Sequence, residues 1–236
     1  SRGLGDVYKR QHIYHLTKTR KSDNLVTKNI FVMFCGGGEI MSYSSEQTRK
    51  RILVCAKKEF LKYGFQGANL RRIASEAKAT TGALYNHFKN KEELFDEIVK
   101  GPTSDLLLKF QVLHDQACRA EGHTQAMEQS NSGTDWMLDY IYEHFDIFKL
   151  VFCCSEGSTY ANYMEKLITI EESAYKAVLS CESNPVDEFF IHIMCSSGFR
   201  ELYEVVAHDL SKEKAVQFME RVKRFRFAGW REILGR

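Results

Sequence analysis

Hydrophobic residues recur every three or four positions along most of the chain after Ser44, which is the spacing of one face of an α-helix. The first such segment covers residues 45–63. Its apolar face consists of Ile52, Ala56 and Phe60. Ser44 and Gln47 have the spacing of a capping box, and Gly64 follows as a residue that can end a helix with a positive φ. The pattern predicts one amphipathic helix over this range.

Two shorter helices are predicted next, joined by a tight turn. Asn69 precedes the first and Thr80 the second, and both residue types cap helix N-termini. In the second, residues 81–88, Leu84 and Phe88 are spaced to face inward, which leaves small, aromatic and polar residues outside. Two short helices joined by three or four residues are typical of a helix-turn-helix, whose second helix enters the major groove of DNA. Ordinary packing of two short helices is the alternative at this point.

The helical pattern continues into the second half of the chain with two expected interruptions. Asn90 and Glu93 form a second capping box, which opens a fourth helix. Pro102 lies inside that helix, where proline kinks or breaks the hydrogen-bond ladder, so we expect an interruption at residues 100–102. Residues 119–133 are polar and contain glycine, and we expect a loop there.

An aromatic stripe follows. Four aromatic or imidazole side chains stand four positions apart, on one side of a predicted helix, and a tyrosine on the next helix can join them. They are Trp136, Tyr140, His144, Phe148 and Tyr163. Such a stripe is usually plain core, but buried imidazole and phenol groups need partners, and a few convergent polar groups in an apolar pocket suit a small ligand. We therefore hypothesise that these five residues line an effector pocket.

The last two predicted helices carry a seam of apolar and small residues at spacings of three and four, as in helical bundles. Small residues at 195–198 would let another helix approach closely. The seam residues are Phe190, Met194 and Ser197 in the first helix and Phe218, Val222 and Phe225 in the second. The seam can pair two copies of the chain, or it can pack within one subunit.

Composition and charge support a folded, helical chain with two unlike parts. Of 236 residues, 2 are proline and 15 are glycine, too few for a turn-rich β-sandwich. The formal net charge of +2 is unevenly distributed: residues 41–100 hold 12 Lys and Arg against 7 Asp and Glu, and residues 101–236 hold 14 against 21. A basic part on an acidic body suits a protein that holds DNA by one face.

Other classes of protein find no support in the sequence. The seven cysteines are odd in number and show no C-x-x-C spacing, so we expect reduced thiols in a cytoplasmic protein, with no metal and no cofactor. No apolar run reaches the roughly 18–20 residues that span a bilayer, so no membrane association is expected. There is no nucleophile elbow, P-loop or dinucleotide turn, so an enzyme is the disfavoured alternative and no catalytic residue is assigned.

Residues 1–40 do not share the helical pattern. Three glycines, a glutamate and an isoleucine stand directly before Met41. Their codons must be G-rich and then purine-rich, as in a bacterial ribosome-binding site upstream of a start codon. We hypothesise that residues 1–40 are a translated leader and that the natural protein starts at Met41. A genuine disordered arm is the alternative.

Two specific runs of residues carry a family resemblance. They are Tyr-Gly-Phe at residues 63–65 and Gly-Ala-Leu-Tyr-Asn-His-Phe-Lys-Asn-Lys-Glu-Glu-Leu at residues 82–94. With them, residues 48–98 resemble the DNA-binding domain of the tetracycline-repressor (TetR/AcrR) family. Three positions depart from the family pattern. Asn69 stands where Thr or Ser usually caps, and Asn caps as well as Ser. Lys78 stands where a turn glycine is usual, which would cost roughly 1 kcal/mol in a left-handed turn, and Thr81 stands where Lys or Arg is common.

The resemblance implies roles for residues in and around the second short helix. Tyr85 and His87 are expected to contact phosphates, with Lys91 adding charge at the start of the fourth helix. The base-facing candidates are Thr80, Thr81, Gly82, Ala83 and Asn86. Phosphate contacts set the register on DNA, and base contacts carry the choice of sequence.

The resemblance also implies an all-α fold and a transcriptional regulator. We expect a three-helix helix-turn-helix domain at residues 41–100, joined by a connecting helix to a helical ligand-binding and dimerisation domain at residues 101–236. The expected partners are a second copy of the chain, a pseudo-palindromic double-stranded DNA operator, and a small effector that releases the repressor from it. The alternative is a constitutive or partner-dependent DNA-binding protein with a filled core and no effector.

Overall fold

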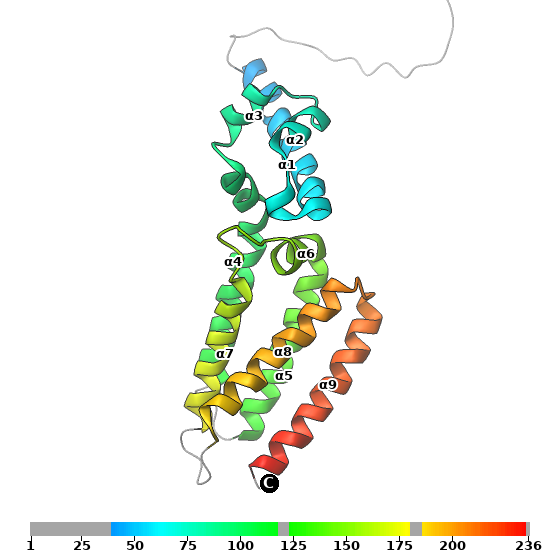
Figure 1. The fold of residues 1–236 in the computed structure, drawn as a ribbon. Coiled ribbons are helices and arrows are strands. Elements are labelled where there is room, and N and C mark those ends of the chain that lie inside the picture. The colour runs from blue at the N-terminus through cyan, green and yellow to red at the C-terminus, as the bar shows by residue number, and fades with distance from the viewer. Residues whose placement is uncertain (1–38, 118–122, 180–185, 235–236) are drawn as a thin grey trace, which may run out of the picture. The chain divides into compact units, whose positions relative to one another are not determined.

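Helices account for all regular structure in residues 39–117, 123–179 and 186–234, the ranges that the computed structural model describes (Figure 1). They are α1 (Glu39–Gly67), α2 (Leu70–Glu76), α3 (Thr81–His87), α4 (Lys91–Ala117), α5 (His123–Glu143), α6 (Phe145–Cys153), α7 (Tyr163–Leu179), α8 (Glu188–Ala207) and α9 (Lys212–Ile233). The all-α prediction is confirmed. Within these ranges, no helix is both long enough and apolar enough to cross a membrane. Most of the hypothesised leader, residues 1–38, lies outside the described residues.

The first helix starts earlier than its sequence pattern predicts. Ser44, expected to cap a helix beginning at residue 45, lies inside α1, and its carbonyl oxygen accepts a hydrogen bond from the Thr48 hydroxyl at 2.9 Å. A capping box is a local signal, and it is overridden when the residues before it can also be helical. The predicted C-terminal feature is confirmed, because Gly64 has φ 69° and ψ 171°, a conformation that strongly favours glycine.

The caps of the next three helices are as predicted. The Asn69 side chain accepts a hydrogen bond from the amide two residues on at 2.9 Å, and Thr80 Oγ1 accepts one from the amide three residues on at 3.0 Å. Asn90 Oδ1 accepts one from the Glu93 amide at 2.8 Å. Each cap satisfies an N–H group that has no partner within its helix. The core beneath these helices is formed by Ile52, Ala56, Phe60, Ile73, Leu84, Phe88 and Phe95.

In the turn between α2 and α3, a residue other than glycine adopts the left-handed region. This is expected, because Lys78 stands where the family pattern has a turn glycine. Lys78 has φ 51°. Its amide donates to the Ser75 carbonyl at 3.1 Å, and the Ala79 amide donates to the Ala74 carbonyl at 2.9 Å. These bonds hold the backbone of the turn in place despite the steric cost of a Cβ at this φ.

Substituting Lys78→Gly is expected to raise the free energy of unfolding by about 1 kcal/mol, because glycine adopts this φ without a Cβ clash. The matched control, Lys78→Ala, removes the same charge but keeps the Cβ, and should stay within about 0.5 kcal/mol of the wild type. Urea unfolding of the three proteins measures the difference. An equal gain from alanine would show that the charge, and not the backbone, is responsible.

The two expected interruptions are wrong. α4 runs without a break through Pro102, because Gly101 before it has no Cβ to clash with the proline ring. Residues 123–133, expected as part of a loop, belong to α5. Polar composition does not prevent a helix, and one glycine within it costs only about 1 kcal/mol. The remaining part of the expected loop up to residue 122 lies outside the described residues.

Helices α4 to α9 form a bundle. α4 lies against α5 and α7, α8 packs on α6 and α7, and α9 lies alongside α5 (Figure 1). α6 packs against α1 as well as α4, so the bundle contacts the helix-turn-helix directly. The largest fully buried side chains of this part are Leu106, Ile141, Phe148, Leu150 and Leu167. The predicted domain boundary at residues 100 and 101 falls within α4, which therefore belongs to both parts.

Candidate functional site

The second short helix of the helix-turn-helix, α3, has a buried face and an outer face. Leu84 and Phe88 are buried, which anchors α3 on α1 and α2. On the other side, Tyr85 is 50% exposed and Asn86 is exposed. Of the remaining candidates, Thr80 and Gly82 are exposed and Thr81, Ala83 and His87 are half-buried. All seven outer residues therefore lie on or beside one short helix.

Small residues at the start of α3 leave room for a close approach. A Cβ added to Gly82 would meet the Thr80 hydroxyl oxygen at 3.9 Å, which is ordinary van der Waals contact. The Asn86 amide carries both donors and an acceptor, the combination that pairs with an adenine edge in the major groove. The outer face of α3 can therefore approach base edges and hydrogen-bond to them.

Lys91 lies at the start of α4, where the resemblance implies that it adds charge. Its ammonium donates to the Gln66 carbonyl at 3.1 Å and lies 4.7 Å from the centre of the Phe65 ring. Both contacts are at the C-terminal end of α1. In this structure Lys91 therefore joins α4 to α1 and does not extend along the outer face of α3.

Three further cations flank α3. Arg71, Lys78 and Lys89 are exposed, and in the described ranges they form no ion pair. Lys57 and Arg72, in contrast, are held in ion pairs with carboxylates. Sequence reasoning missed this distinction, because the partner of a cation can be far away in the chain. A cation that forms no ion pair within the protein can contact a phosphate without first losing a partner.

A buried carboxylate holds α2 on α1. Glu59 is 4% exposed, and its Oε1 accepts hydrogen bonds from the Asn69 amide at 2.9 Å and from Arg72 Nε at 2.8 Å. The Arg72 guanidinium also lies 4.4 Å from the centre of the Tyr63 ring and donates to the Gly67 carbonyl at 3.1 Å. Because α3 follows α2 after a short turn, this network determines how α3 is presented.

The five predicted effector-site residues lie close together, although not on one helix. α5 ends one residue before His144 and α6 begins one residue after it, with φ −120° and ψ 35° at the break. Ring centroids are 5.3 Å apart for Trp136 and Tyr140, 4.7 Å for Tyr140 and His144, and 6.0 Å for Tyr140 and Phe148. Tyr163 joins them through a phenylalanine of α6.

The buried side chains of this aromatic cluster already have packing or hydrogen-bond partners within the chain. Phe148 and Tyr163 are buried, and the Tyr163 hydroxyl donates to the Thr103 carbonyl at 2.7 Å. Burial raises the pKa of Tyr163, so this phenol stays protonated. At the outer end, Trp136 and Tyr140 are half-buried. A ligand would therefore have to enter at the Trp136 and Tyr140 end and displace packed rings.

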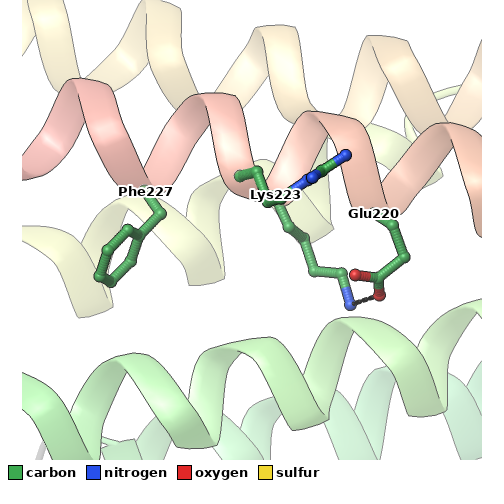
Figure 2. Close-up of a pocket in the computed structure, with 4 residues that line it drawn as sticks. Glu220, Lys223 and Phe227 are labelled. Atoms are coloured by element: carbon green, nitrogen blue, oxygen red, sulfur yellow. Dashed lines mark ion pairs between the residues drawn. The ribbon is translucent and has the colours of Figure 1, made fainter.

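A hollow of about 370 Å³ lies elsewhere, on α9. It is lined by Glu220, Lys223, Arg224 and Phe227. Figure 2 shows Glu220, Lys223 and Phe227 extending from α9 toward the facing helix. Lys223 pairs with Asp135 of α5 at 2.6 Å and also with Glu220, so its charge is already balanced. The lining of this hollow includes none of the five predicted effector-site residues.

The α8 half of the predicted dimer seam packs inside its own chain. The Phe190 ring meets Trp230 of α9 edge-on, with centroids 5.7 Å apart. Arg226 of α9 donates to the Met194 carbonyl at 2.9 Å and to the Ser197 hydroxyl at 2.8 Å. α9 therefore contacts the Phe190 ring, the Met194 backbone and the Ser197 hydroxyl within the same chain, which is the alternative that the sequence pattern left open.

Exposed apolar side chains lie beside that seam. On α9, Phe218 is 38% exposed and Phe225 is 76% exposed, and Val222 is half-buried. On α8, Phe189 is 70% exposed and Ile193 is 45% exposed. Side chains adjacent in sequence point about 100° apart on a helix, so the free apolar face of α8 is displaced from the predicted one.

A half-buried histidine, His114, links α4 to α7. His114 Nδ1 lies 2.9 Å from the Phe110 carbonyl oxygen, and Nε2 lies 2.6 Å from Glu171 Oε2. Both partners are acceptors, so the ring satisfies both contacts only when both nitrogens carry protons. Burial by itself lowers the pKa of His114, but the hydrogen bond and charge of Glu171 outweigh it, and the pKa is raised.

The raised pKa of His114 predicts how the stability of the fold changes with pH. Protonated His114 stabilises the fold fully below its unfolded pKa of about 6.5, and that contribution is lost as the pH rises through the higher folded pKa. The wild type should therefore melt at a higher temperature than His114→Gln. This difference should be largest in mild acid and smallest in mild alkali. The control, His192→Gln, removes the more exposed imidazole that faces Glu172. A difference for His114→Gln that grows with pH would contradict the ion pair.

Comparison with known proteins identifies the N-terminal part. The family model described as bacterial regulatory proteins, tetR family, matches residues 52–98. An HTH-type transcriptional repressor of Streptomyces coelicolor is 33% identical over 115 residues, which cover 49% of this chain and 52% of that repressor. The HTH-type transcriptional regulator AcrR of Shigella flexneri is 43% identical over 54 residues, 23% of this chain and 25% of that protein. The chain thus spans about half the length of the first relative and a quarter of the second.

Two solved structures share the fold over most of the chain. A Clostridium perfringens protein described as a fatty acid metabolism regulator has a TM-score of 0.55 and 22% identity, covering 78% of this chain and 97% of that one. NalD of Pseudomonas aeruginosa, the secondary repressor of the MexAB-OprM multidrug efflux pump, has a TM-score of 0.52 and 19% identity, covering 76% and 96%. At these identities the likeness concerns the fold alone. By the family-model match, residues 52–98 are similar to the helix-turn-helix of the tetR family of bacterial regulatory proteins.

Proposed function

We propose that this chain is a sequence-specific DNA-binding transcriptional regulator, a repressor that acts in the cytoplasm. The observation that carries the proposal is the exposed outer face of α3, held rigidly by buried Leu84 and Phe88. The proposed base contacts are Thr80, Thr81, Gly82, Ala83 and Asn86, and the proposed phosphate contacts are Arg71, Lys78, Tyr85, His87 and Lys89. Lys91 is left out, because its ammonium is held at the end of α1. The similarity to a named repressor supports the direction of regulation.

Two substitutions separate base contacts from phosphate contacts on a selected operator. Asn86→Ala should weaken binding by roughly 10–100-fold and relax the base preference at one position of each half-site. Lys89→Ala should weaken binding to all sequences alike and reduce the slope of log affinity against log salt by about one. Fluorescence anisotropy over a salt series measures both effects. Lys166→Ala, an exposed cation of α7, is the control. Wild-type affinity in Asn86→Ala would contradict base reading by α3.

We further propose that two copies pair through the exposed apolar residues of α8 and α9. These residues are exposed Phe189, Ile193, Phe218 and Phe225 together with half-buried Val222, and in α8 they differ from the positions predicted from sequence. The support is their exposure, since contiguous exposed apolar side chains mark interaction surfaces. A two-fold symmetric dimer would present two α3 helices to successive major grooves, and its operator would be a pseudo-palindrome.

An effector is proposed to enter at the half-buried end of the aromatic cluster, at Trp136 and Tyr140. The packed rings favour the second candidate function, a constitutive or partner-dependent DNA-binding protein without an effector. A thermal-shift screen of hydrophobic cations and drugs distinguishes the two, because a ligand of the native state raises the melting temperature. A shift that is lost in Trp136→Ala supports the effector, and no shift from any compound supports the second function.

A further inference from the structure

One turn of the bundle contacts both ends of the helix-turn-helix unit. Residues 154–162 join α6 to α7 and form the α6–α7 turn. The Cys154 carbonyl accepts a hydrogen bond from the Phe65 amide at 2.7 Å. Because Gly64 ends the main run of α1, the Phe65 amide has no partner within that helix. The turn thereby supplies the missing acceptor and grips the end of α1.

The same turn is held by two carboxylates of α4. Glu92 Oε1 accepts hydrogen bonds from the Thr159 amide at 2.9 Å and from the Thr159 hydroxyl at 2.6 Å. One helical turn further on, Asp96 Oδ1 accepts a hydrogen bond from the Tyr160 hydroxyl at 2.7 Å. Burial and the neighbouring Asp96 raise the pKa of Tyr160, so its hydroxyl keeps the proton that it donates.

The turn is itself well braced. Ser155 is buried, and its hydroxyl donates to the Val151 carbonyl at 2.6 Å. The Ser158 hydroxyl donates to the Ser155 carbonyl at 2.7 Å, and Gly157 adopts φ 84°, which favours glycine. Because these hydrogen bonds hold its conformation, the turn moves together with the bundle, and so do the residues of α1 and α4 that it contacts.

The covalent link between the two parts contains a residue that cannot donate a helical hydrogen bond. α4 is the segment that connects them, and Pro102 within it cannot donate a hydrogen bond to the Ile98 carbonyl. Glycine at position 101 loosens the same place. Glu92 and Asp96 lie on the helix-turn-helix side of this point. If α4 bends there, the tilt of the helix-turn-helix is limited by the other contacts between the two parts, which are the packing of α6 on α1 and the hydrogen bonds of the α6–α7 turn.

We infer that Glu92, Asp96, Thr159 and Tyr160 are positioning residues, a clasp that sets the angle between the helix-turn-helix and the bundle. For its effect on DNA this inference rests on the proposed function. In a dimer, the clasp would set the separation of the two α3 helices and hence the half-site spacing that the protein accepts. It would act through α3 without touching DNA.

The angle is tested first on the full chain without DNA. Spin labels are placed on exposed Lys58 of α1 and exposed Arg200 of α8 through non-natural amino acids, which leaves the native cysteines unchanged. Pulsed electron paramagnetic resonance gives the distribution of distances between them. In the variant Tyr160→Phe/Glu92→Ala, the distribution should become roughly twice as wide as in the wild type, because the helix-turn-helix can tilt locally.

A matched control removes equivalent groups that take no part in the clasp. Tyr142→Phe/Glu165→Ala deletes a tyrosine hydroxyl that donates to the Leu210 carbonyl at 2.7 Å and an acidic residue of the first turn of α7. Its distance distribution should match that of the wild type. A clasp variant whose distribution superimposes on that of the wild type would overturn the inference.

The consequence for DNA is tested on operators with base pairs inserted or removed between the half-sites. Each base pair shifts a half-site by about 3.4 Å along the helix axis. The wild type should prefer one spacing, and its preference should fall by roughly 3–10-fold for each clasp hydrogen bond removed. Equal weakening at all spacings would overturn the clasp as a positioning device. A wild type that selects no operator would overturn the proposed function, while the distance measurement would still decide the clasp.

Discussion

Replacing Phe95 with alanine is expected to lower the free energy of unfolding by about 3–5 kcal/mol, the usual cost of truncating a buried phenylalanine. The Phe95 side chain is fully buried on α4. Its ring meets Phe60 edge-on at 5.0 Å, Phe65 at 5.3 Å and Tyr160 at 5.9 Å between centroids. Alanine would remove these contacts and leave a cavity where α1, α4 and the α6–α7 turn meet. Chemical denaturation followed by circular dichroism measures the loss.

The control for Phe95→Ala is Leu108→Ala on the same helix. Leu108 is 69% exposed, so its truncation should change the free energy of unfolding by no more than about 0.5 kcal/mol. A loss below about 1 kcal/mol for Phe95→Ala would contradict its position at the centre of the helix-turn-helix core.

Glu59→Ala is expected to cost about 3 kcal/mol of stability, since it removes the acceptor of a buried charged network. The Asn69 amide would lose its partner, and the Arg72 guanidinium would lose a bidentate contact. The Arg72 side chain is 45% exposed, and water can solvate it, so we place the cost at the low end for broken buried pairs. Thermal and urea unfolding both measure this loss.

Two further substitutions show whether the loss of stability in Glu59→Ala comes from the buried network. Glu59→Gln keeps an oxygen that can accept from the Asn69 amide but removes the charge, so its cost should fall between alanine and wild type. Glu76→Ala, on the exposed side of α2, should leave stability within about 0.5 kcal/mol of the wild type. If Glu59→Ala and Glu76→Ala were equally mild, the Glu59 network would not hold α2 in place.

The helix-turn-helix was predictable because several local signals agree there. The caps Asn69, Thr80 and Asn90 coincide with the starts of the apolar pattern, and each makes the predicted hydrogen bond. Gly64 and Lys78 take the positive φ values that their positions in the pattern demand. Capping and periodicity involve residues three or four positions apart, so the sequence contains all of that information.

The features that the sequence left open depend on contacts between residues far apart in the chain. Periodicity shows which residues of α8 face inward, but it does not show whether α9 of the same chain or a second chain covers Phe190. The same holds for Lys91, whose partner is the Gln66 carbonyl, and for the clasp between Glu92 and Thr159. Local propensity also failed at Pro102, where the preceding glycine makes a continuous helix tolerable.

Selection of DNA from a random-sequence pool by the full chain tests most directly whether α3 reads base sequence. We expect enrichment of one sequence with two symmetric half-sites, their centres separated by about 10–10.5 base pairs or a multiple of that distance. Repeating the selection with Asn86→Ala should relax one position in each half-site. Recovered DNA without a common sequence, or the same sequence with unchanged preference from Asn86→Ala, would contradict DNA reading by this helix.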